Sequence, residues 1–118
     1  MIKVLLAHPD KKILGIYQNN LKDCFDFDSV YDGLSAVRKF KQFKPDCVVS
    51  DYDLPLLSGI TFLKFIRNSE DNDTPFLFLT NHLDNSEALG LSANDWIDQS
   101  SSSPEFLIKK IYYHLKTT

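Results

Sequence analysis

Residues 47–59 read Cys-Val-Val-Ser-Asp-Tyr-Asp-Leu-Pro-Leu-Leu-Ser-Gly, and this stretch decides the fold. A short apolar run ends at Asp51, a turn with Pro55 follows, and Gly59 opens a segment of helical periodicity. An apolar run of this length is typical of a buried parallel strand. Open α/β sheets place their chemistry beyond the carboxyl ends of such strands, so Asp51 is the first candidate functional residue.

Outside this stretch, apolar runs alternate with segments of helical periodicity along the whole chain. The sequence predicts strands at residues 2–7, 27–30, 46–50, 76–80 and 96–97. It predicts helices at residues 11–24, 33–43, 59–68 and 86–91, and a last helix that begins at Pro104 with Ser103 as its N-cap. This alternation predicts an α/β fold: a doubly wound, five-stranded parallel sheet of flavodoxin-like order 2-1-3-4-5, with helices on both faces.

The helical periodicity also predicts which side chains face the core. In the second helix the inward positions are Leu34, Val37, Phe40 and the stem of Lys41. In the last helix they are Leu107, Ile108, Ile111 and Leu115. This spacing leaves Phe106, Lys110 and Tyr113 on an outer face close to Trp96, an aromatic and basic composition typical of interfaces. The alternative is that Phe106 and Tyr113 fold back over a core margin left by a shortened fourth helix.

Length, charge and cysteine content set the broad class of the protein. With 118 residues, 43% of them hydrophobic, we expect residues 1–118 to form a single domain with no output domain after it. The net charge of -3 predicts no binding of nucleic acid or of an anionic membrane. The N-terminal apolar run is too short for a signal peptide or a membrane span. Isolated Cys24 and Cys47 suit a reducing compartment, so the expected location is the cytoplasm.

Three features together resemble the receiver domains of two-component response regulators. They are the D-x-x-x-P-x-x-x-G run from Asp51, Thr80 at the end of the next predicted strand, and the alternating pattern of the whole chain. The resemblance implies that Asp51 is the phosphoryl acceptor and that Thr80 contacts the phosphoryl group. It also implies that Trp96 occupies the place of the switch aromatic residue.

Two features that the resemblance implies are missing. After the first strand, receivers carry adjacent acidic residues that hold a divalent metal, whereas this chain has His8 and Pro9 there, with Asp10 one place later. After the fifth strand they carry a lysine, and the best alignment puts Gln99 at that position. Losing the lysine removes a charge-assisted contact worth roughly 1.5–3 kcal/mol.

Magnesium prefers an octahedral shell of oxygen ligands, and the replaced acidic pair would have supplied part of that shell. Asp51 is then the main anionic ligand, with Asp10 or Asp53 as its helpers. We therefore expect weak binding of Mg²⁺ and no other cofactor. A second possible site combines His8, Asp10, Asp51 and His82, because imidazole and carboxylate ligands suit zinc or manganese.

These observations predict a stand-alone, atypical receiver domain in phosphorelay signal transduction that acts through protein–protein interaction. It is not an enzyme beyond self-phosphorylation and dephosphorylation at Asp51. The expected partners are a histidine kinase or another signalling protein, and a second copy of the chain. One alternative is a conventional phospho-accepting receiver switched by a histidine kinase. A flavodoxin-like FMN carrier is a weaker alternative, because residues 8–12 lack a Ser-, Thr- or Gly-rich phosphate loop.

Overall fold

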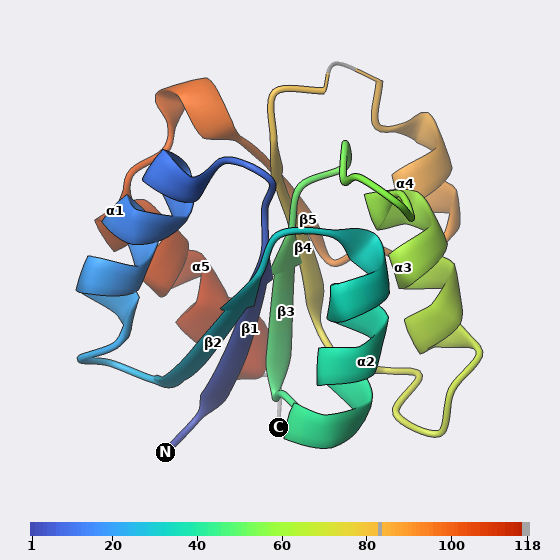
Figure 1. Cartoon of the computed structure of the whole chain (residues 1–118), viewed down its shortest axis with the longest axis horizontal. Helices are drawn as coiled ribbons and strands as arrows, with labels where there is room; N and C mark the ends of the chain where they lie inside the picture. The colour runs from blue at the N-terminus through green and yellow to red at the C-terminus, as the bar shows by residue number, and fades with distance from the viewer. Residues whose placement is uncertain (83, 117–118) are drawn as a thin grey trace.

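The predicted strands assemble into one sheet, seen at the centre of Figure 1. The computed structural model describes residues 1–82 and 84–116. The strands are β1 (Lys3–Ala7), β2 (Asp26–Val30), β3 (Cys47–Ser50), β4 (Phe76–Thr80) and β5 (Asp95–Asp98). They pair in parallel in the order β2-β1-β3-β4-β5, which confirms the predicted sheet and its topology.

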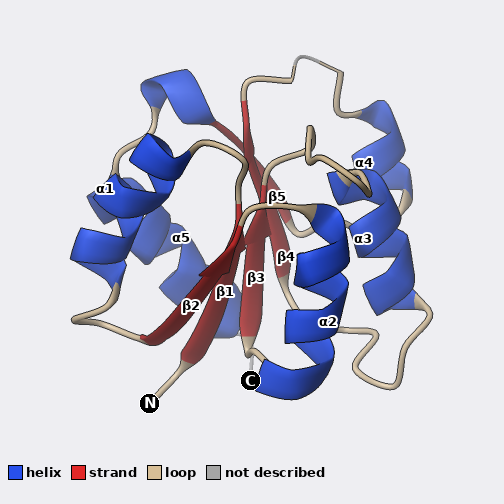
Figure 2. Ribbon diagram, viewed as in Figure 1, coloured by secondary structure: helices blue, strands red, loops and turns tan. Residues whose placement is uncertain are grey.

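Helices cover both faces of this sheet, as Figure 2 shows. They are α1 (Lys11–Leu21), α2 (Gly33–Phe43), α3 (Gly59–Arg67), the short α4 (Ser86–Gly90) and α5 (Pro104–Leu115). Helices α1 and α5 lie on one face, and α2, α3 and α4 lie on the other. Helices α1, α2, α3 and α5 each begin after a residue whose side chain accepts backbone N–H groups of the first turn: Asp10, Asp32, Ser58 and Ser103.

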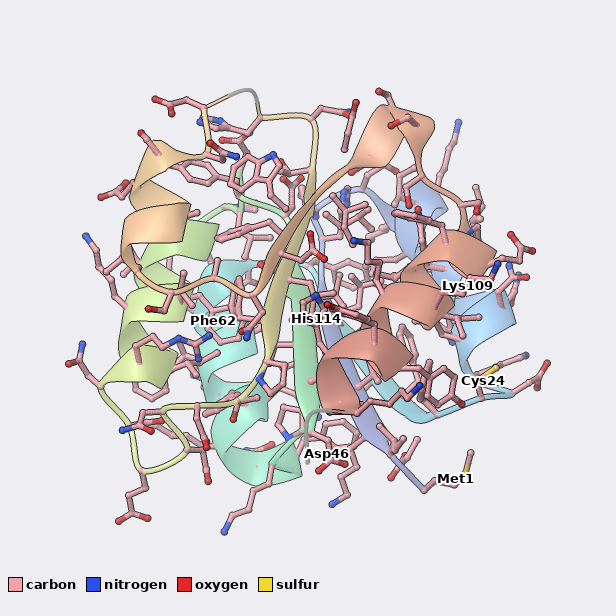
Figure 3. The ribbon with its side chains drawn as sticks, turned by 180° about the vertical axis from the view of Figure 1, so that it is seen from behind. Met1, Cys24, Asp46, Phe62, Lys109 and His114 are labelled. Atoms are coloured by element: carbon pink, nitrogen blue, oxygen red, sulfur yellow. The ribbon has the colours of Figure 1, made fainter. Side chains whose placement is uncertain are left out.

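The central strands are apolar on both faces because helices cover both. Leu5 and Phe78 pack toward α2 and α3, whereas their neighbours Leu6 and Leu77 pack toward α1 and α5. Figure 3 shows the molecule from behind, with α5 beside the sheet and His114 on the side of α5 that faces the sheet. Such two-sided burial explains why these strands appear as continuous apolar runs rather than as an alternating pattern.

The predicted inner face of α2 is partly wrong. Leu34 is 42% exposed, and the buried positions of the helix are Gly33, Ala36 and Phe40. A Cβ on Gly33 would collide with the carbonyl oxygen of Leu57, so the backbone of α2 approaches the β3–α3 connection at this glycine. With Gly33 turned inward, the next residue faces outward. Lys41 is also exposed.

The two outer strands differ from the central ones in their charge. Strand β2 carries Asp26 and Asp28, and β5 carries Asp95 and Asp98. Both strands extend beyond the predicted apolar segments, because their ends pair with a neighbour despite their polar side chains. Across residues 1–82 and 84–116, no helix is long and apolar enough to cross a membrane.

Candidate functional site

The carboxyl ends of β1, β3, β4 and β5 meet at the upper edge of the sheet in Figure 1. Asp51 directly follows β3, and its backbone N–H continues the ladder with a bond of 2.9 Å to the carbonyl of Ala7. The chain then returns so tightly that a Cβ on Gly59 would collide with the carbonyl oxygen of Asp51. The glycine eight residues after Asp51 is thus required by this close approach of the backbone.

One half of the site joins Asp51 to Thr80. The Asp51 carboxylate is buried, and its Oδ1 atom accepts a hydrogen bond of 2.5 Å from the Thr80 hydroxyl. The same oxygen accepts the backbone N–H of Asp53 at 3.2 Å. The Thr80 hydroxyl in turn accepts the N–H of His82 at 3.1 Å. The structure therefore brings together the two residues that the sequence places at the ends of β3 and β4.

The other half joins Asp51 to His8 and Gln99. The His8 ring is only 2% exposed, and its Nδ1 atom accepts the backbone N–H of Asp10 at 3.1 Å. We therefore assign the ring proton to Nε2, which lies 2.5 Å from the amide oxygen of Gln99 and 3.4 Å from Oδ2 of Asp51. In this tautomer His8 is a neutral donor that faces both the amide and the carboxylate.

The other carboxylates predicted near Asp51 have different partners. Asp10 accepts the N–H groups of Lys12 and Ile13 at 2.8 and 3.4 Å, and so caps α1. Asp53 is exposed, and its Oδ2 atom lies 3.5 Å from Nδ1 of His82. Both carboxylates are thus engaged by groups other than the Asp51 side chain.

A metal site built from His8, Asp10, Asp51 and His82 does not form. Within the part of the chain that the structure describes, no three His, Cys, Asp or Glu side chains are grouped as metal ligands. The two histidines have different carboxylate partners: Nε2 of His8 faces Asp51, whereas the His82 ring pairs with Asp53. The transition-metal alternative therefore has no support in this geometry.

An aromatic cluster that the sequence did not predict covers the β4 side of the site. The rings of Tyr52 and His82 stack at 3.8 Å with an angle of 17° between their planes. The Tyr52 ring also lies 5.8 Å from both Phe78 and Trp96. Its hydroxyl donates to Glu87 at 3.3 Å. Partial burial, followed by the nearby Glu87 carboxylate, raises the pKa of Tyr52, so the phenol stays a donor near neutral pH.

The predicted partner face is exposed on α5. Phe106 and Tyr113 are 44% and 68% exposed, so neither folds back over the core. The Lys110 ammonium lies 5.5 Å from the centre of the Phe106 ring and 3.1 Å from Asp95. Partial burial alone would raise the pKa of Asp95, but hydrogen bonds from His114 and Lys110 outweigh it, and the pKa is lowered. Trp96 is half-buried and borders this face.

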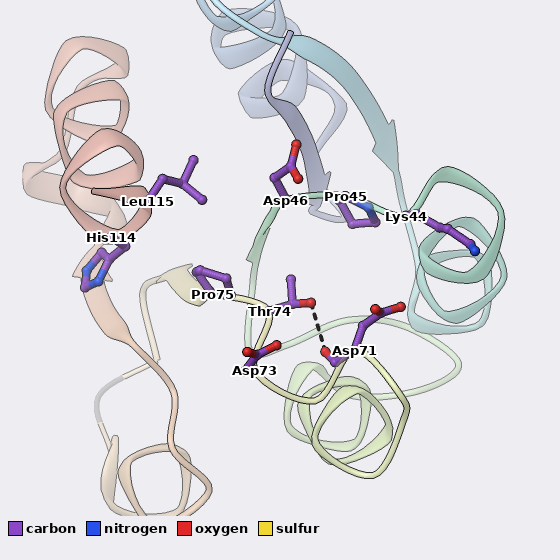
Figure 4. A pocket seen from close by; sticks show the side chains of 9 residues that line it. All are labelled: Lys44, Pro45, Asp46, Asp71, Asp73, Thr74, Pro75, His114 and Leu115. Atoms are coloured by element: carbon purple, nitrogen blue, oxygen red, sulfur yellow. Dashed lines mark hydrogen bonds between the residues drawn. The ribbon is translucent and has the colours of Figure 1, made fainter. Parts of the chain in front are cut away.

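A separate hollow of about 400 Å³ lies at the opposite, amino edge of the sheet (Figure 4). Its walls come from the connection before β3, the connection before β4 and the end of α5. The lining residues are Lys44, Pro45, Asp46, Asp71, Asp73, Thr74, Pro75, His114 and Leu115. The hollow shares none of its lining residues with the Asp51 site.

Residues 4–111 match the family described as the response regulator receiver domain. The chain belongs to this family. The position of Asp51 at the end of β3 and of Thr80 at the end of β4 agrees with the resemblance seen in the sequence. Receiver domains are signalling modules of two-component systems and are generally not enzymes in their own right.

Named relatives support this assignment. The transcriptional regulatory protein TrcR of Mycobacterium tuberculosis is 30% identical over 112 residues, which are 92% of this chain and 43% of TrcR. The chain thus spans less than half the length of such curated relatives. The chemotaxis response regulator CheY4 of Vibrio cholerae superimposes with a TM-score of 0.87 at 26% identity, covering 97% of this chain and 98% of CheY4.

A third neighbour shares the fold at lower sequence identity. The receiver domain of the sensor histidine kinase PA1611 from Pseudomonas aeruginosa shares the fold, with a TM-score of 0.88, 21% identity and 98% coverage of both chains. That protein holds a magnesium ion in its active site cleft. In the present chain His8 and Pro9 carry no carboxylate, and the Asp10 carboxylate caps α1.

Proposed function

We propose that this chain is an atypical receiver domain that transmits its signal through protein–protein interaction, with Asp51 in the acceptor position. The observation that carries the proposal is the buried contact of His8 with Gln99 and Asp51. The family resemblance implies a metal-binding carboxylate at the position of His8 and a lysine at the position of Gln99. The site keeps its acceptor and hydroxyl, and neutral groups replace its charges.

The electrostatic consequence follows from the chemistry of phosphoryl transfer. An incoming phosphoryl group brings negative charge, and its transfer depends mainly on positioning and on neutralisation of that charge. A neutral imidazole and an amide can donate or accept hydrogen bonds but supply no positive charge. A neutral hydrogen bond contributes about 0.5–1.5 kcal/mol, compared with roughly 1.5–3 kcal/mol for one to a charged group. Phosphorylation of Asp51 should therefore be slow.

A conventional phospho-accepting receiver is the second candidate, and the bond between Thr80 and Asp51 favours it. Receiver domains interact with histidine kinases and other signalling proteins. In that function a kinase phosphohistidine would be the donor. The nitrogen–phosphorus bond breaks, its electron pair stays on the imidazole, and an oxygen of Asp51 bonds to phosphorus.

The test is incubation with a small acyl phosphate, with and without magnesium, followed by intact-mass measurement. An atypical site predicts slow, incomplete addition of one phosphoryl group, with little dependence on magnesium. Rapid, complete and magnesium-dependent addition would favour the conventional receiver instead. Asp51→Asn should abolish the mass increase, whereas Asp53→Asn, which leaves the acceptor intact, should preserve it. A mass increase that persists in Asp51→Asn would move the acceptor elsewhere.

We also propose that the exposed face of α5 binds a partner or a second copy of the chain. Its aromatic and basic composition, with Phe106 and Tyr113 exposed beside Lys110, supports this role. Replacing Phe106 and Tyr113 by Ala should weaken self-association or partner binding, as measured by analytical ultracentrifugation. The melting temperature should change little, because both rings lie outside the core. A large fall in melting temperature would instead assign them a packing role.

A further inference from the structure

The aromatic cluster around Tyr52 lies between Asp51 and the short helix α4. Tyr52 is bonded directly to Asp51 in the chain, and its ring reaches across to His82, which follows β4. From there its hydroxyl reaches Glu87 in α4. No other side chain among the described residues is hydrogen-bonded to α4 from the end of β3.

A continuous set of hydrogen bonds links the acceptor to this stack. The Thr80 hydroxyl has one proton, which it donates to Asp51, and it accepts the backbone N–H of His82. A change at Asp51 that turns the Thr80 hydroxyl must therefore disturb the bond that fixes His82. Because the His82 ring lies flat on Tyr52 at 3.8 Å, a shift of one ring changes the contacts of the other.

Helix α4 depends on contacts of this kind. It has five residues, far fewer than a helix needs to be stable on its own. Ala88 is fully buried against the sheet, and Glu87 accepts from Tyr52 while its second oxygen lies 3.5 Å from the Lys64 ammonium of α3. Loss of the Tyr52 bond removes one of the few polar contacts that hold α4 in place.

Trp96 packs against the same cluster. Its ring lies 5.1 Å from Phe78, 5.8 Å from Tyr52 and 6.2 Å from His82. It is half-buried, and among the described residues its side chain has no hydrogen bond to α4. The family resemblance assigns the switching role to this position, but Tyr52 is the ring of the cluster that is hydrogen-bonded to α4.

We propose that Tyr52, and not Trp96, is the aromatic residue through which the state of Asp51 reaches α4. In this arrangement Thr80 and His82 transmit a change at the acceptor, and the Tyr52 hydroxyl tightens or releases α4 through Glu87. The inference goes beyond the proposed function and does not depend on it. The coupling is present in the unmodified protein, whether or not Asp51 accepts a phosphoryl group.

The experiment is amide hydrogen exchange of residues 86–91 in the full chain, read by mass spectrometry. Tyr52→Phe removes only the hydroxyl and should speed exchange in α4 by about threefold to tenfold, the range expected for one hydrogen bond. Thr80→Val should also speed it, although Thr80 has no hydrogen bond to α4. In the double variant the two effects should not multiply, because both act through the same bond.

Three control variants accompany these measurements. Tyr113→Phe removes a phenol hydroxyl from the exposed face of α5 and should leave amide exchange in α4 unchanged. Thr80→Ser keeps the hydroxyl group and should show wild-type exchange in α4, which separates loss of the hydroxyl from poor folding of Thr80→Val. Trp96→Phe combined with Thr80→Val should preserve the acceleration. Unchanged α4 exchange in Thr80→Val, multiplied effects in the double variant, or coupling lost with Trp96→Phe would each overturn the proposal.

Discussion

The two halves of the site differ in how far their side chains match the residues that the receiver family resemblance implies. On the β3–β4 side, the Thr80 hydroxyl donates a hydrogen bond to the Asp51 carboxylate. On the β1 and β5 side, His8 and Gln99 bond to each other and place one proton near the carboxylate. Both halves are hydrogen-bonded, but one joins the two residues of the family motif and the other presents an imidazole and an amide.

The backbone geometry of the site and the charges of its side chains have different origins. The strand ends, the close approach at Gly59 and the burial of Asp51 all follow from the parallel sheet. The charge balance depends on single side chains, which can be replaced without disturbing that sheet. Each half of the site can therefore be altered while the other is left intact.

The largest effect should come from restoring charge to the β1 and β5 side. A variant with His8→Asp, Pro9→Asp and Gln99→Lys should accept phosphoryl groups about ten- to a hundredfold faster, because charged contacts replace neutral ones. The rate is measured by intact mass over time with an acyl phosphate and magnesium. Gln99→Met, which has similar length and no charge, should give no such gain. An unchanged rate in the triple variant would mean that missing charge on the β1 and β5 side does not limit the rate of phosphorylation.

Magnesium binding should also depend on the β1 side of the site, where His8 and Pro9 lie. The wild-type protein should show no saturable change in Trp96 fluorescence at low millimolar Mg²⁺, whereas the double variant His8→Asp, Pro9→Asp should saturate. The added carboxylates would supply oxygen ligands next to Asp51. Saturation in the wild-type protein would contradict the comparison, since Asp10 or Asp53 would then have to leave its present partner.

The buried His8 side chain should contribute more to stability than His82 does. His8→Ala leaves the Gln99 amide and the Asp10 N–H without their partner, at a cost of roughly 1–3 kcal/mol in the free energy of unfolding. His82→Ala should cost less, because that ring is partly solvent-exposed. Urea unfolding of both variants gives the two values. Equal losses would show that the two halves support the fold alike.

The smallest expected effect concerns Asp95, which shares β5 with the site but lies outside it. Its pKa is lowered in the folded state, so its ion pairs stabilise the protein above the unfolded pKa of about 3.9. That contribution is lost as the pH falls through the folded pKa. Asp95→Asn should lower stability by about 1 kcal/mol or less at pH 7. The difference from wild type, measured by urea unfolding, should shrink as the pH falls below about 3.9 and through the lowered folded-state pKa. A difference that stays constant with pH would contradict the ion-pair explanation.

The sheet could be predicted from the sequence because both sides of β1, β3 and β4 are apolar, which leaves a strong local signal. Asp51 and Thr80 were predictable because each follows such a run. The contact between His8 and Gln99 was not, since 91 residues separate them and it depends on which way a ring turns. The Tyr52–His82 stack was missed for the same reason. Leu34 was misplaced because the inward turn of Gly33 depends on the backbone of a different connection.

The charged outer strands affect how copies of the chain can associate. An open sheet edge is a template on which further strands can add, and natural proteins block such addition with charged side chains. Here Asp26 and Asp28 mark one edge, and Asp95 and Asp98 mark the other. Strand-to-strand growth would bring carboxylates together at either edge, although Asp28 and Asp95 are already paired with Lys39 and Lys110. Addition of further strands at either edge of the sheet is therefore disfavoured by charge.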